Sequence, residues 1–571
     1  MRTKPRDSRN HRKQQHSTKA ARPNEHAARR DLPVALHDVI ELEIVGLAHE
    51  GEGVGRFGGF TLFVPGALPG ERVRARVAEL RKNFGRAELL EVLAASPDRV
   101  AAPCAVYARC GGCQLQHFAY EGQLRWKRQL VVDALERIGK LRVAPLAGGP
   151  FRGDSLGSGS GEGGASADGP FRGDSLGAGS EEGEGAADAP FGGDSLGSGS
   201  GEGGESADGP FRGDSLTSDF GGVVVHPVLG MDEPWRYRNK AQVPIGFDLE
   251  EGGLVGGFYE QGSHRIVSTD ACLIQHERND DAVLAAKRIA RELGIEAYDV
   301  TSHSGWLRHV VAKVSFASGE MMLVLVGMTR SVDGLDAYVA RLRDELPHVV
   351  SICLNVNPDR TSAVFGKETA TLWGADVIFD SIGGIRFAIS ARSFYQVNPV
   401  QTERLYGKAL EYAALEGGET VIDAYCGIGT ISLFLARAAR QVYGVELIPD
   451  AVEDARANAR LNDIDNADFA VGRAEVVLPA WREQGIDADV IVVDPPRKGC
   501  DPALLDTLVA MAPKRIVYVS CNPATLARDL ATLEAGGFRT VEVQPVDMFP
   551  HTGHVECVAL VVRDETDSEK R

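Results

Sequence analysis

The strongest constraint on the fold is a regular alternation of strand-like and helix-like runs that begins near residue 385. Such alternation is typical of a parallel sheet with helices on both faces. We therefore predict an α/β doubly wound, Rossmann-like domain over 385–563. The runs that carry this prediction are 420–424, 431–439, 441–446, 450–461, 490–494 and 515–520. With 571 residues the chain is too long for one core, so further domains are expected upstream.

A glycine-containing turn after the first of these strands predicts a ligand pocket. The run Asp423-Ala424-Tyr425-Cys426-Gly427-Ile428-Gly429-Thr430 leads from a strand into a helix, where backbone N–H groups can approach a ligand closely. Glu446 and Asp494 end two further strands, and an acidic side chain about 20 residues after the turn can accept from ribose hydroxyls. The spacing is not the G-x-G-x-x-G of dinucleotide folds, so S-adenosylmethionine is the favoured ligand. A tight packing turn is the alternative.

Three short runs carry reactive side chains. Asp494 opens Asp494-Pro495-Pro496-Arg497, Cys521 lies in Ser520-Cys521-Asn522-Pro523, and Glu556 follows Gly553-His554-Val555. A thiol and a carboxylate beside a nucleotide-type cofactor suit methyl transfer to a pyrimidine carbon, because that carbon must first be activated by covalent attack at its neighbour. A thiol suits this addition because it is partly ionised near neutral pH and leaves readily. The alternatives are a small buried hydrophobe for Cys521 and a surface carboxylate for Glu556.

Near the N-terminus, short β-like runs alternate with glycine turns from about Val39 to Leu93. About five strands in this length predict an OB-like β-barrel over 38–97, a common platform for single-stranded nucleic acid. A purely structural barrel is the alternative. Basic residues along these runs predict a basic edge, formed by Arg72, Arg74, Arg76, Arg81 and Lys82.

A cysteine cluster follows the barrel. Cys104, Cys110 and Cys113 form a C-x5-C-G-G-C run, and Cys272 is the only later cysteine before Cys353. Three close thiolates with one distant thiolate can hold an iron–sulfur cluster or zinc, and the spacing alone does not choose between them. It differs from the C-x3-C-x2-C spacing of radical enzymes, so we expect a structural or RNA-organising role. A disulfide framework fits poorly in a large chain of intracellular character.

Charge and composition leave the binding partner open. The net charge of −18 argues against nucleic acid, but it is unevenly distributed. Residues 1–31 hold ten Lys/Arg and three Asp/Glu, whereas 151–220 hold three and fourteen. We interpret 1–37 as a disordered basic tail and 146–221 as a disordered acidic insertion of 20-residue repeats, the first starting at Phe151. Without an apolar run of ~18 residues or a signal-peptide core, a cytoplasmic protein is expected.

Together these motifs resemble the RNA uracil-5 methyltransferase family, most closely its 23S ribosomal RNA branch, over about 39–145 and 222–563. Ser520-Cys521-Asn522-Pro523 resembles the family's nucleophile motif, and His554-Val555-Glu556 resembles its base motif. Ser393-Phe394-Tyr395-Gln396-Val397-Asn398 resembles the motif that opens its methyltransferase domain. Trp235-Arg236-Tyr237-Arg238-Asn239-Lys240 resembles its central-domain signature. The barrel is similar to the family's TRAM domain.

The resemblance implies methylation of uridine C5 in 23S rRNA, with Cys521 as nucleophile and Glu556 as base. It implies that the S-adenosylmethionine cofactor is bound or positioned by Gln396, Tyr425, Thr430, Glu446 and Asp494. It further implies a [4Fe-4S] cluster, rather than zinc, on Cys104, Cys110, Cys113 and Cys272. A central RNA-binding and iron–sulfur domain would then take 98–145 and 222–384, and 564–571 would form a short disordered tail.

Two other functions stay open at this point. A tRNA uracil-5-methyltransferase would use the same chemistry, although its bacterial branch typically lacks the barrel and the cysteine run. An RNA-binding or ribosome-assembly factor is the second, and an intact pair of Cys521 and Glu556 argues against it. We expect a monomer with RNA as partner and no membrane. The target uridine must flip out of its stack, and the candidates for holding that RNA are Trp235, Arg236, Arg238, Lys240, Arg308 and His309.

Overall fold

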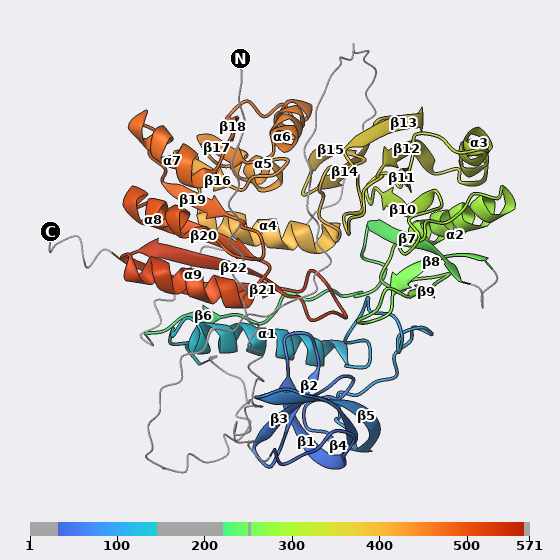
Figure 1. Cartoon of the computed structure of the whole chain (residues 1–571). Helices are drawn as coiled ribbons and strands as arrows, with labels where there is room; N and C mark the ends of the chain where they lie inside the picture. The colour runs from blue at the N-terminus through green and yellow to red at the C-terminus, as the bar shows by residue number, and fades with distance from the viewer. Residues whose placement is uncertain (1–31, 146–220, 249–252, 565–571) are drawn as a thin grey trace, which may run out of the picture.

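A computed structural model of the chain describes residues 32–145, 221–248 and 253–564 (Figure 1). The predicted acidic repeats and nearly all of the predicted basic tail lie outside these residues. The described chain forms a small barrel, a central sheet with two flanking helices, and a larger C-terminal sheet (Figure 1). Within these described ranges, no helix is both long and apolar enough to cross a membrane.

The N-terminal barrel is closed by five strands in the order β1-β2-β3-β5-β4. Alternate side chains of β1 and β4 point inward, and Ile44, Leu62 and Val73 are fully buried. This inward and outward alternation is what closes a short sheet around one core. The predicted OB-like barrel is therefore confirmed. Its strands are β1 (Val39–Leu47), β2 (Gly53–Phe57), β3 (Phe60–Val64), β4 (Arg72–Leu80) and β5 (Phe84–Ala94).

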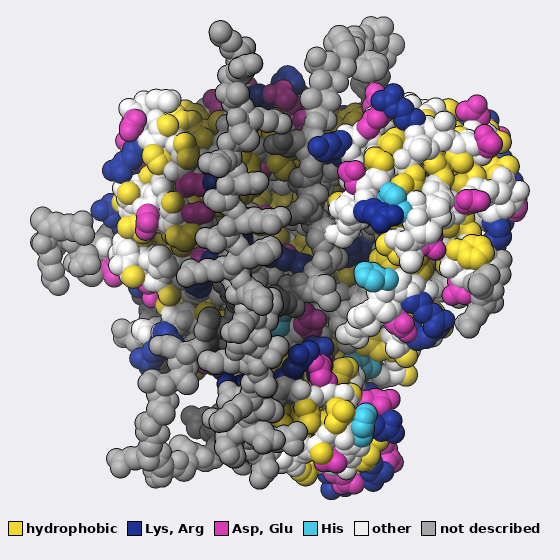
Figure 2. All heavy atoms as spheres, in the orientation of Figure 1, with side chains coloured by type: hydrophobic (Ala, Val, Ile, Leu, Met, Phe, Trp, Pro, Cys, Tyr) yellow, Lys and Arg dark blue, Asp and Glu magenta, His cyan; other side chains and the backbone are white. Residues whose placement is uncertain are grey.

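The predicted basic edge of this barrel is largely neutralised by acidic neighbours. Figure 2 shows acidic and basic side chains side by side over the barrel at the bottom of the view. The strand register explains this, because Glu side chains of β1 and β5 stand opposite Arg side chains of β4. The pairs are Arg74 with Glu41 and Glu91, Arg76 with Glu88, and Arg81 with Glu79.

The central part is a seven-stranded sheet in the order β13-β12-β11-β10-β7-β8-β9. Its two middle strands are buried at every position except His309, because helix α2 covers one face and the C-terminal part packs on the other. The strands are β7 (Lys240–Asp248), β8 (Gly253–Tyr259), β9 (Ile266–Ser268), β10 (Leu307–Val314), β11 (Met321–Gly327), β12 (Val349–Val356) and β13 (Glu368–Gly374). The helices are α2 (Glu277–Glu292) and α3 (Leu335–Glu345). A hairpin of β14 (Val377–Ile382) and β15 (Ile385–Ser390) follows.

The C-terminal part is an eight-stranded sheet in the order β18-β17-β16-β19-β20-β22-β21-β6. Strands β16 to β20 run parallel with helices between them, as the alternation predicts, and β22 runs antiparallel to β20. The strands are β16 (Thr420–Ala424), β17 (Gln441–Glu446), β18 (Ala467–Val471), β19 (Val490–Val493), β20 (Arg515–Ser520), β21 (Phe538–Val546) and β22 (Glu556–Arg563). The helices are α4 (Pro399–Ala413), α5 (Thr430–Ala436), α6 (Pro449–Leu461), α7 (Ala474–Glu483), α8 (Pro502–Met511) and α9 (Pro523–Ala535).

Two elements from the predicted central domain pack instead with the C-terminal sheet. Helix α1 (Tyr120–Arg137) lies against α9, and β6 (Val224–Val225) pairs in parallel with β21. The apolar side chains of α1 and β6 share one core with strands β16, β19 and β20. In Figure 1, α1 lies between the barrel and this sheet. The α1 helix therefore connects the N-terminal parts of the chain to the C-terminal sheet.

Candidate active site

The predicted ligand pocket lies where the strand order of the C-terminal sheet reverses. The chain runs from β16 outward through β17 and β18, then returns to add β19 on the other side of β16. Ligands of doubly wound folds bind at the carboxyl ends of the strands that flank this point. Tyr425, Glu446 and Asp494 follow or end β16, β17 and β19, so the fold brings three of the five predicted cofactor residues to this edge.

The glycine turn after β16 contains residues with a left-handed backbone conformation. Tyr425 has φ = 70°, in the left-handed region that is uncommon for a residue with a side chain. Gly429 has φ = 82°, and a Cβ there would lie 3.2 Å from the Cβ of Ala455. Local strain of this kind gathers at ligand sites. Glu446 joins the same turn, because its Oε2 accepts from the Gly427 amide at 3.2 Å and its Oε1 from the Ile448 amide at 3.0 Å. Each carboxylate oxygen retains a lone pair for a ligand hydroxyl.

The other two predicted cofactor residues are connected through a tyrosine that the sequence did not single out. Tyr406 on α4 donates its hydroxyl to Thr430 Oγ1 at 3.1 Å, and the Gln396 side chain lies close enough to this hydroxyl to affect its pKa. The Gln396 carbonyl accepts from Asn239 Nδ2 at 2.9 Å, which ties the central-domain signature to the pocket. A tyrosine on the buried face of an amphipathic helix is indistinguishable from a core residue in sequence, so no signal marked Tyr406.

Buried carboxyl groups give the pocket an acidic character that fits a cationic ligand. Burial raises the pKa of Asp494 to about 6 and that of Asp423 to about 7. Ser432 donates to Asp423 Oδ2 at 2.5 Å, while the buried Oδ1 has no hydrogen-bond partner. Buried carboxyl groups favour a positively charged ligand, because a nearby positive charge stabilises the ionised carboxylates that burial disfavours. This donor set therefore fits the sulfonium and amino groups of S-adenosylmethionine.

Cys521 lies between β20 and helix α9, in a turn built from its own neighbours. Asn522 is the N-cap of α9 and accepts from the Ala524 amide at 3.0 Å, while the fixed φ of Pro523 suits the first helical position. The Asn522 amide donates to Ser520 Oγ at 3.2 Å. Ser520 pairs with Cys557 across β20 and β22, so the next position in the register sets Cys521 opposite Glu556. The fold therefore brings the two predicted reactive side chains together.

The electrostatics of this pair differ from the expectation for the thiol. The pKa of Cys521 is raised to about 12, mainly by burial and in smaller part by the charges of Glu556 and Asp494. The thiol is therefore neutral at pH 7 in the ligand-free protein, and the expected partial ionisation is wrong for this state. Burial also raises the pKa of Glu556 to about 8, with Asp494 adding to the rise. The exposed Arg497 opposes both shifts, so this residue of the Asp494-Pro495-Pro496-Arg497 run has an electrostatic role that the sequence did not reveal.

The four predicted metal-ligand cysteines gather at one junction beside the central sheet. The pKa of Cys113 is raised to about 11, mainly by burial and in smaller part by the neighbouring Cys110 and Cys104. The pKa of Cys272 is likewise raised to about 12, mainly by burial and in smaller part by Cys113. Among the residues that the structure describes, however, no group of three or more His, Cys, Asp or Glu is arranged to hold a metal ion. The thiols share one neighbourhood without forming a ready-made metal site.

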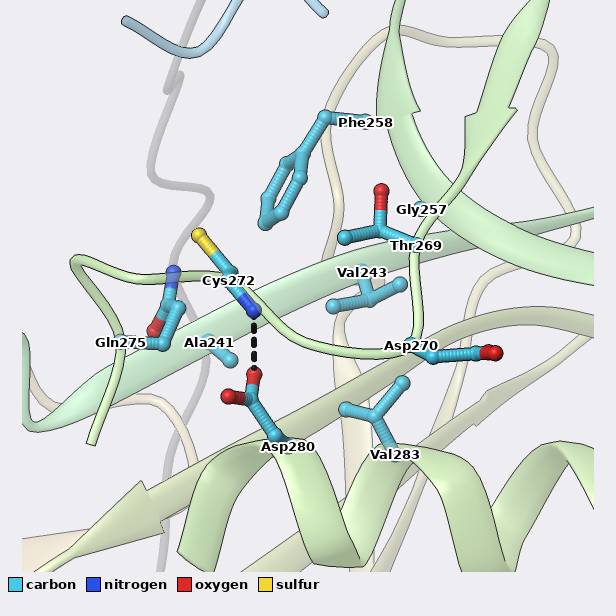
Figure 3. Close-up of a pocket in the computed structure, with 10 residues that line it drawn as sticks. All are labelled: Ala241, Val243, Gly257, Phe258, Thr269, Asp270, Cys272, Gln275, Asp280 and Val283. Carbon is cyan, nitrogen blue, oxygen red and sulfur yellow. Dashed lines mark hydrogen bonds between the residues drawn. The ribbon is translucent and has the colours of Figure 1, made fainter. Parts of the chain in front are cut away.

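A pocket behind Cys272 shows what fixes the fourth thiol (Figure 3). Asp280 from α2 accepts the Cys272 amide at 3.1 Å, the bond drawn as a dashed line in Figure 3. The second oxygen of Asp280 accepts from Arg236 at 2.6 Å, and the same guanidinium donates to the Cys272 carbonyl at 2.9 Å. Arg236, a candidate for holding RNA, is thus engaged in fixing this turn. Arg308 is engaged similarly, by the carbonyls of Asn357, Asp359 and Thr361.

Comparisons with known proteins place this geometry in a family. Residues 381–564 match the tRNA (Uracil-5-)-methyltransferase family, and residues 36–90 match the TRAM domain. An uncharacterized RNA methyltransferase of Halalkalibacterium halodurans is 49% identical over 94% of this chain and 99% of its own length. The chain belongs to the RNA uracil-5-methyltransferase family. Another RNA methyltransferase, from Clostridium tetani, is 41% identical over 93% of this chain and 98% of its own length.

A solved structure of this family aligns with nearly the whole chain. It is the tRNA (uracil-54, C5)-methyltransferase of Pyrococcus abyssi in complex with S-adenosyl-L-homocysteine. Its TM-score is 0.62 at 25% identity, with 92% of this chain and 100% of that chain covered. Membership confirms S-adenosylmethionine as methyl donor, RNA as the substrate class and the barrel as a TRAM domain. It leaves the RNA species and the roles of single residues to be argued.

Proposed function

We propose that this uracil-5-methyltransferase forms 5-methyluridine in 23S rRNA, with Cys521 as nucleophile and Glu556 as base. The observation that carries the proposal is the register of β20 and β22, which sets these two side chains opposite each other beside Asp494 and the cofactor edge. Burying a carboxyl group next to a thiol is destabilising, because burial disfavours the charged form of each group. Such perturbed pairs are found mainly at functional sites.

The reaction balances with these two residues and the family's cofactor. The Cys521 sulfur bonds to uridine C6, and the C5–C6 π electrons move toward the C4 carbonyl to give an enolate. S-Adenosylmethionine supplies the methyl group that C5 then takes. Glu556 removes the C5 proton, the released electron pair restores the C5–C6 double bond, and the Cys521 thiolate leaves. One proton is released per turnover, because the thiol gives up its proton at the start and regains one at the end.

The chain's own charges explain how a neutral thiol enters this cycle. Burial and the charge of Asp494 favour the protonated Cys521 thiol in the ligand-free protein, and Arg497 favours the thiolate. A cationic ligand beside Asp494 would offset the acidic charge and lower the pKa of the thiol. Nucleophile activation would then follow cofactor binding. This order protects a reactive thiolate until the methyl donor is in place.

The assignment to 23S rRNA rests on the branch whose motifs the chain resembles most. A tRNA substrate is the second candidate, and one finding favours it: a tRNA uracil-54 enzyme aligns with 92% of this chain. An alignment over nearly the whole chain therefore does not separate the two substrates. In either RNA the target uridine must leave its stack, at least cost from a loop. An assembly factor without catalysis is the third candidate.

Tritium release from C5-labelled uridine tests the chemistry and the substrate together. Transcripts of 23S rRNA and of tRNA would be compared, with wild-type protein, Cys521→Ala, and Cys353→Ala as a control at a buried cysteine of the central sheet. We expect tritium release from 23S rRNA with the wild-type protein. Activity should fall at least about 10³-fold in Cys521→Ala, and Cys353→Ala should retain wild-type activity. Release from tRNA alone would overturn the 23S assignment and keep the chemistry. Release that survives in Cys521→Ala would overturn the nucleophile.

We also propose that Cys104, Cys110, Cys113 and Cys272 hold a [4Fe-4S] cluster with a structural role. Four thiols from two segments are the usual donor set of such a cluster, and Asp280 with Arg236 fixes the backbone of the distant one. Protein purified without air should contain about four iron atoms and four sulfides per chain, and Cys272→Ser should lose them. Zinc without sulfide would overturn the cluster in favour of a zinc site.

A further inference from the structure

His551, five residues before the base, is held by residues from several distant parts of the chain. Its carbonyl accepts from the amides of Gln114 and Leu115 at 3.0 and 2.9 Å, directly after the cysteine run. Its amide donates to Gln123 Oε1 at 3.0 Å, and its Nδ1 lies 3.2 Å from Gln123 Nε2. The Trp235 ring stacks on the imidazole, with centroids 3.7 Å apart and planes at 19°. His551 is 4% exposed and has φ = 66°.

The rest of this segment, Asp547–Val555, which we term the base loop, is anchored just as widely. Lys127 of α1 donates to Asp547 Oδ1 at 2.6 Å and to the Phe549 carbonyl at 3.1 Å, inside the fold. Asn398 of α4 donates to the Met548 carbonyl at 3.1 Å. Tyr237 of the central-domain signature donates to the Pro550 carbonyl at 3.1 Å. A residue other than glycine keeps a left-handed backbone only where the surrounding structure fixes it, and the anchors of the base loop do this for His551.

A short internal frame carries this anchoring from His551 to the base. Thr552 Oγ1 donates to the Phe549 carbonyl at 2.8 Å and accepts from the His554 amide at 3.3 Å. Gly553 rests against the barrel, where a Cβ would lie 2.5 Å from the His49 carbonyl. Val555 is buried, and Glu556 starts β22. Each residue from His551 to Glu556 is therefore fixed by a hydrogen bond, by close packing or by burial.

We propose that His551 is a positioning residue, which fixes Glu556 for removal of the C5 proton and makes that step depend on the cysteine run, α1 and the central domain. This inference rests on the proposed roles of Cys521 and Glu556. Addition of Cys521 and methyl transfer need no base at C5, because the C5 proton is lost only afterwards. A displaced carboxylate therefore slows elimination selectively and leaves a methylated covalent adduct between Cys521 and C6 of the RNA.

Two variants loosen His551 without touching the reacting groups. His551→Asn removes the imidazole but retains a residue that tolerates a left-handed backbone. Gln123→Leu removes the bonds to His551 and those to the Leu115 and Phe118 carbonyls. In single-turnover reactions with labelled methyl donor and RNA, we expect methyl incorporation within about threefold of wild type and elimination slowed about 10²-fold. The adduct would appear as a labelled protein–RNA band that survives denaturing electrophoresis.

Controls separate the inference from the chemistry beneath it. Glu556→Gln should give the same band, and Cys521→Ala should give none. His226→Asn alters a histidine that bonds Glu542 at the far edge of the sheet and should behave as wild type. If Glu556→Gln gives the band but His551→Asn and Gln123→Leu do not, the positioning role is overturned and the proposed function stands. If Glu556→Gln gives no band, the role of the base is overturned. Equal loss of methylation and elimination, with a lowered melting temperature, would reduce His551 to a folding residue.

Discussion

The two reactive side chains stand opposite each other but are held in opposite ways. The turn of Cys521 is built mainly from residues within about four positions of it, as in the bonds of Asn522 to Ser520 and Ala524, and it is tied to one further segment through the Arg497 carbonyl. The base loop is built from partners far away in sequence, such as Gln123, which lies 428 positions from His551. The nucleophile is therefore a product of local sequence, and the base a product of tertiary structure. Damage to distant segments should reach the base before it reaches the nucleophile.

The largest expected effect on stability comes from breaking the ion pair of Lys127 and Asp547, which anchors the base loop. Lys127 and Asp547 are both fully buried, so Lys127→Met leaves an uncompensated carboxylate in the core. We expect a loss of about 3–5 kcal/mol in the free energy of unfolding, measured by denaturant titration. The matched control is Lys514→Met, whose ion pair with Asp489 at 2.9 Å is exposed on the lysine side. That change should cost less than about 1 kcal/mol. Equal costs would contradict the distinction between the two regions.

Two asparagines that cap helices allow the comparison to be made with one substitution. Asn398 and Asn522 each precede a proline at a helix start and cap α4 and α9, Asn398 by accepting from the Gln401 amide and Asn522 from the Ala524 amide. Asn522 Nδ2 reaches the nearby Arg497 carbonyl, whereas Asn398 Nδ2 donates to the buried Met548 carbonyl of the base loop. Asn522→Ala should cost about 1 kcal/mol for the lost cap.

Asn398→Ala should cost about 1–3 kcal/mol more, because it also removes the donor to a buried carbonyl. Thermal and denaturant unfolding of the two variants give the difference directly. An equal cost for both caps would show that the Met548 contact adds nothing to the stability of the base loop.

The same division explains what sequence reasoning could and could not reach. The strand and helix alternation and the barrel follow from patterns within short windows, and these predictions agree with the structure. The paired charges that neutralise the basic edge depend on cross-strand register, which a list of arginines does not contain. Tyr406 and His551 read as core residues in sequence, because their partners lie on other elements. The placement of α1 with the C-terminal sheet is likewise visible only in the fold.

The expected effect that separates the two reactive groups chemically is the dependence on pH. The pKa of Glu556 is raised to about 8 and that of Cys521 to about 12. A base must be ionised, so the rate of elimination should rise about tenfold per pH unit below pH 8 and level off above it. Between the unfolded value of 4.5 and about 8, the folded protein retains a proton on Glu556 that the unfolded chain releases. Stability should therefore fall as pH rises through this window, and Glu556→Gln should remove that fall. Pre-steady-state elimination rates and unfolding free energies from pH 5 to 9 measure both slopes. A base held as loosely as a surface carboxylate would titrate near its ordinary value, and the rise in rate would end near pH 5.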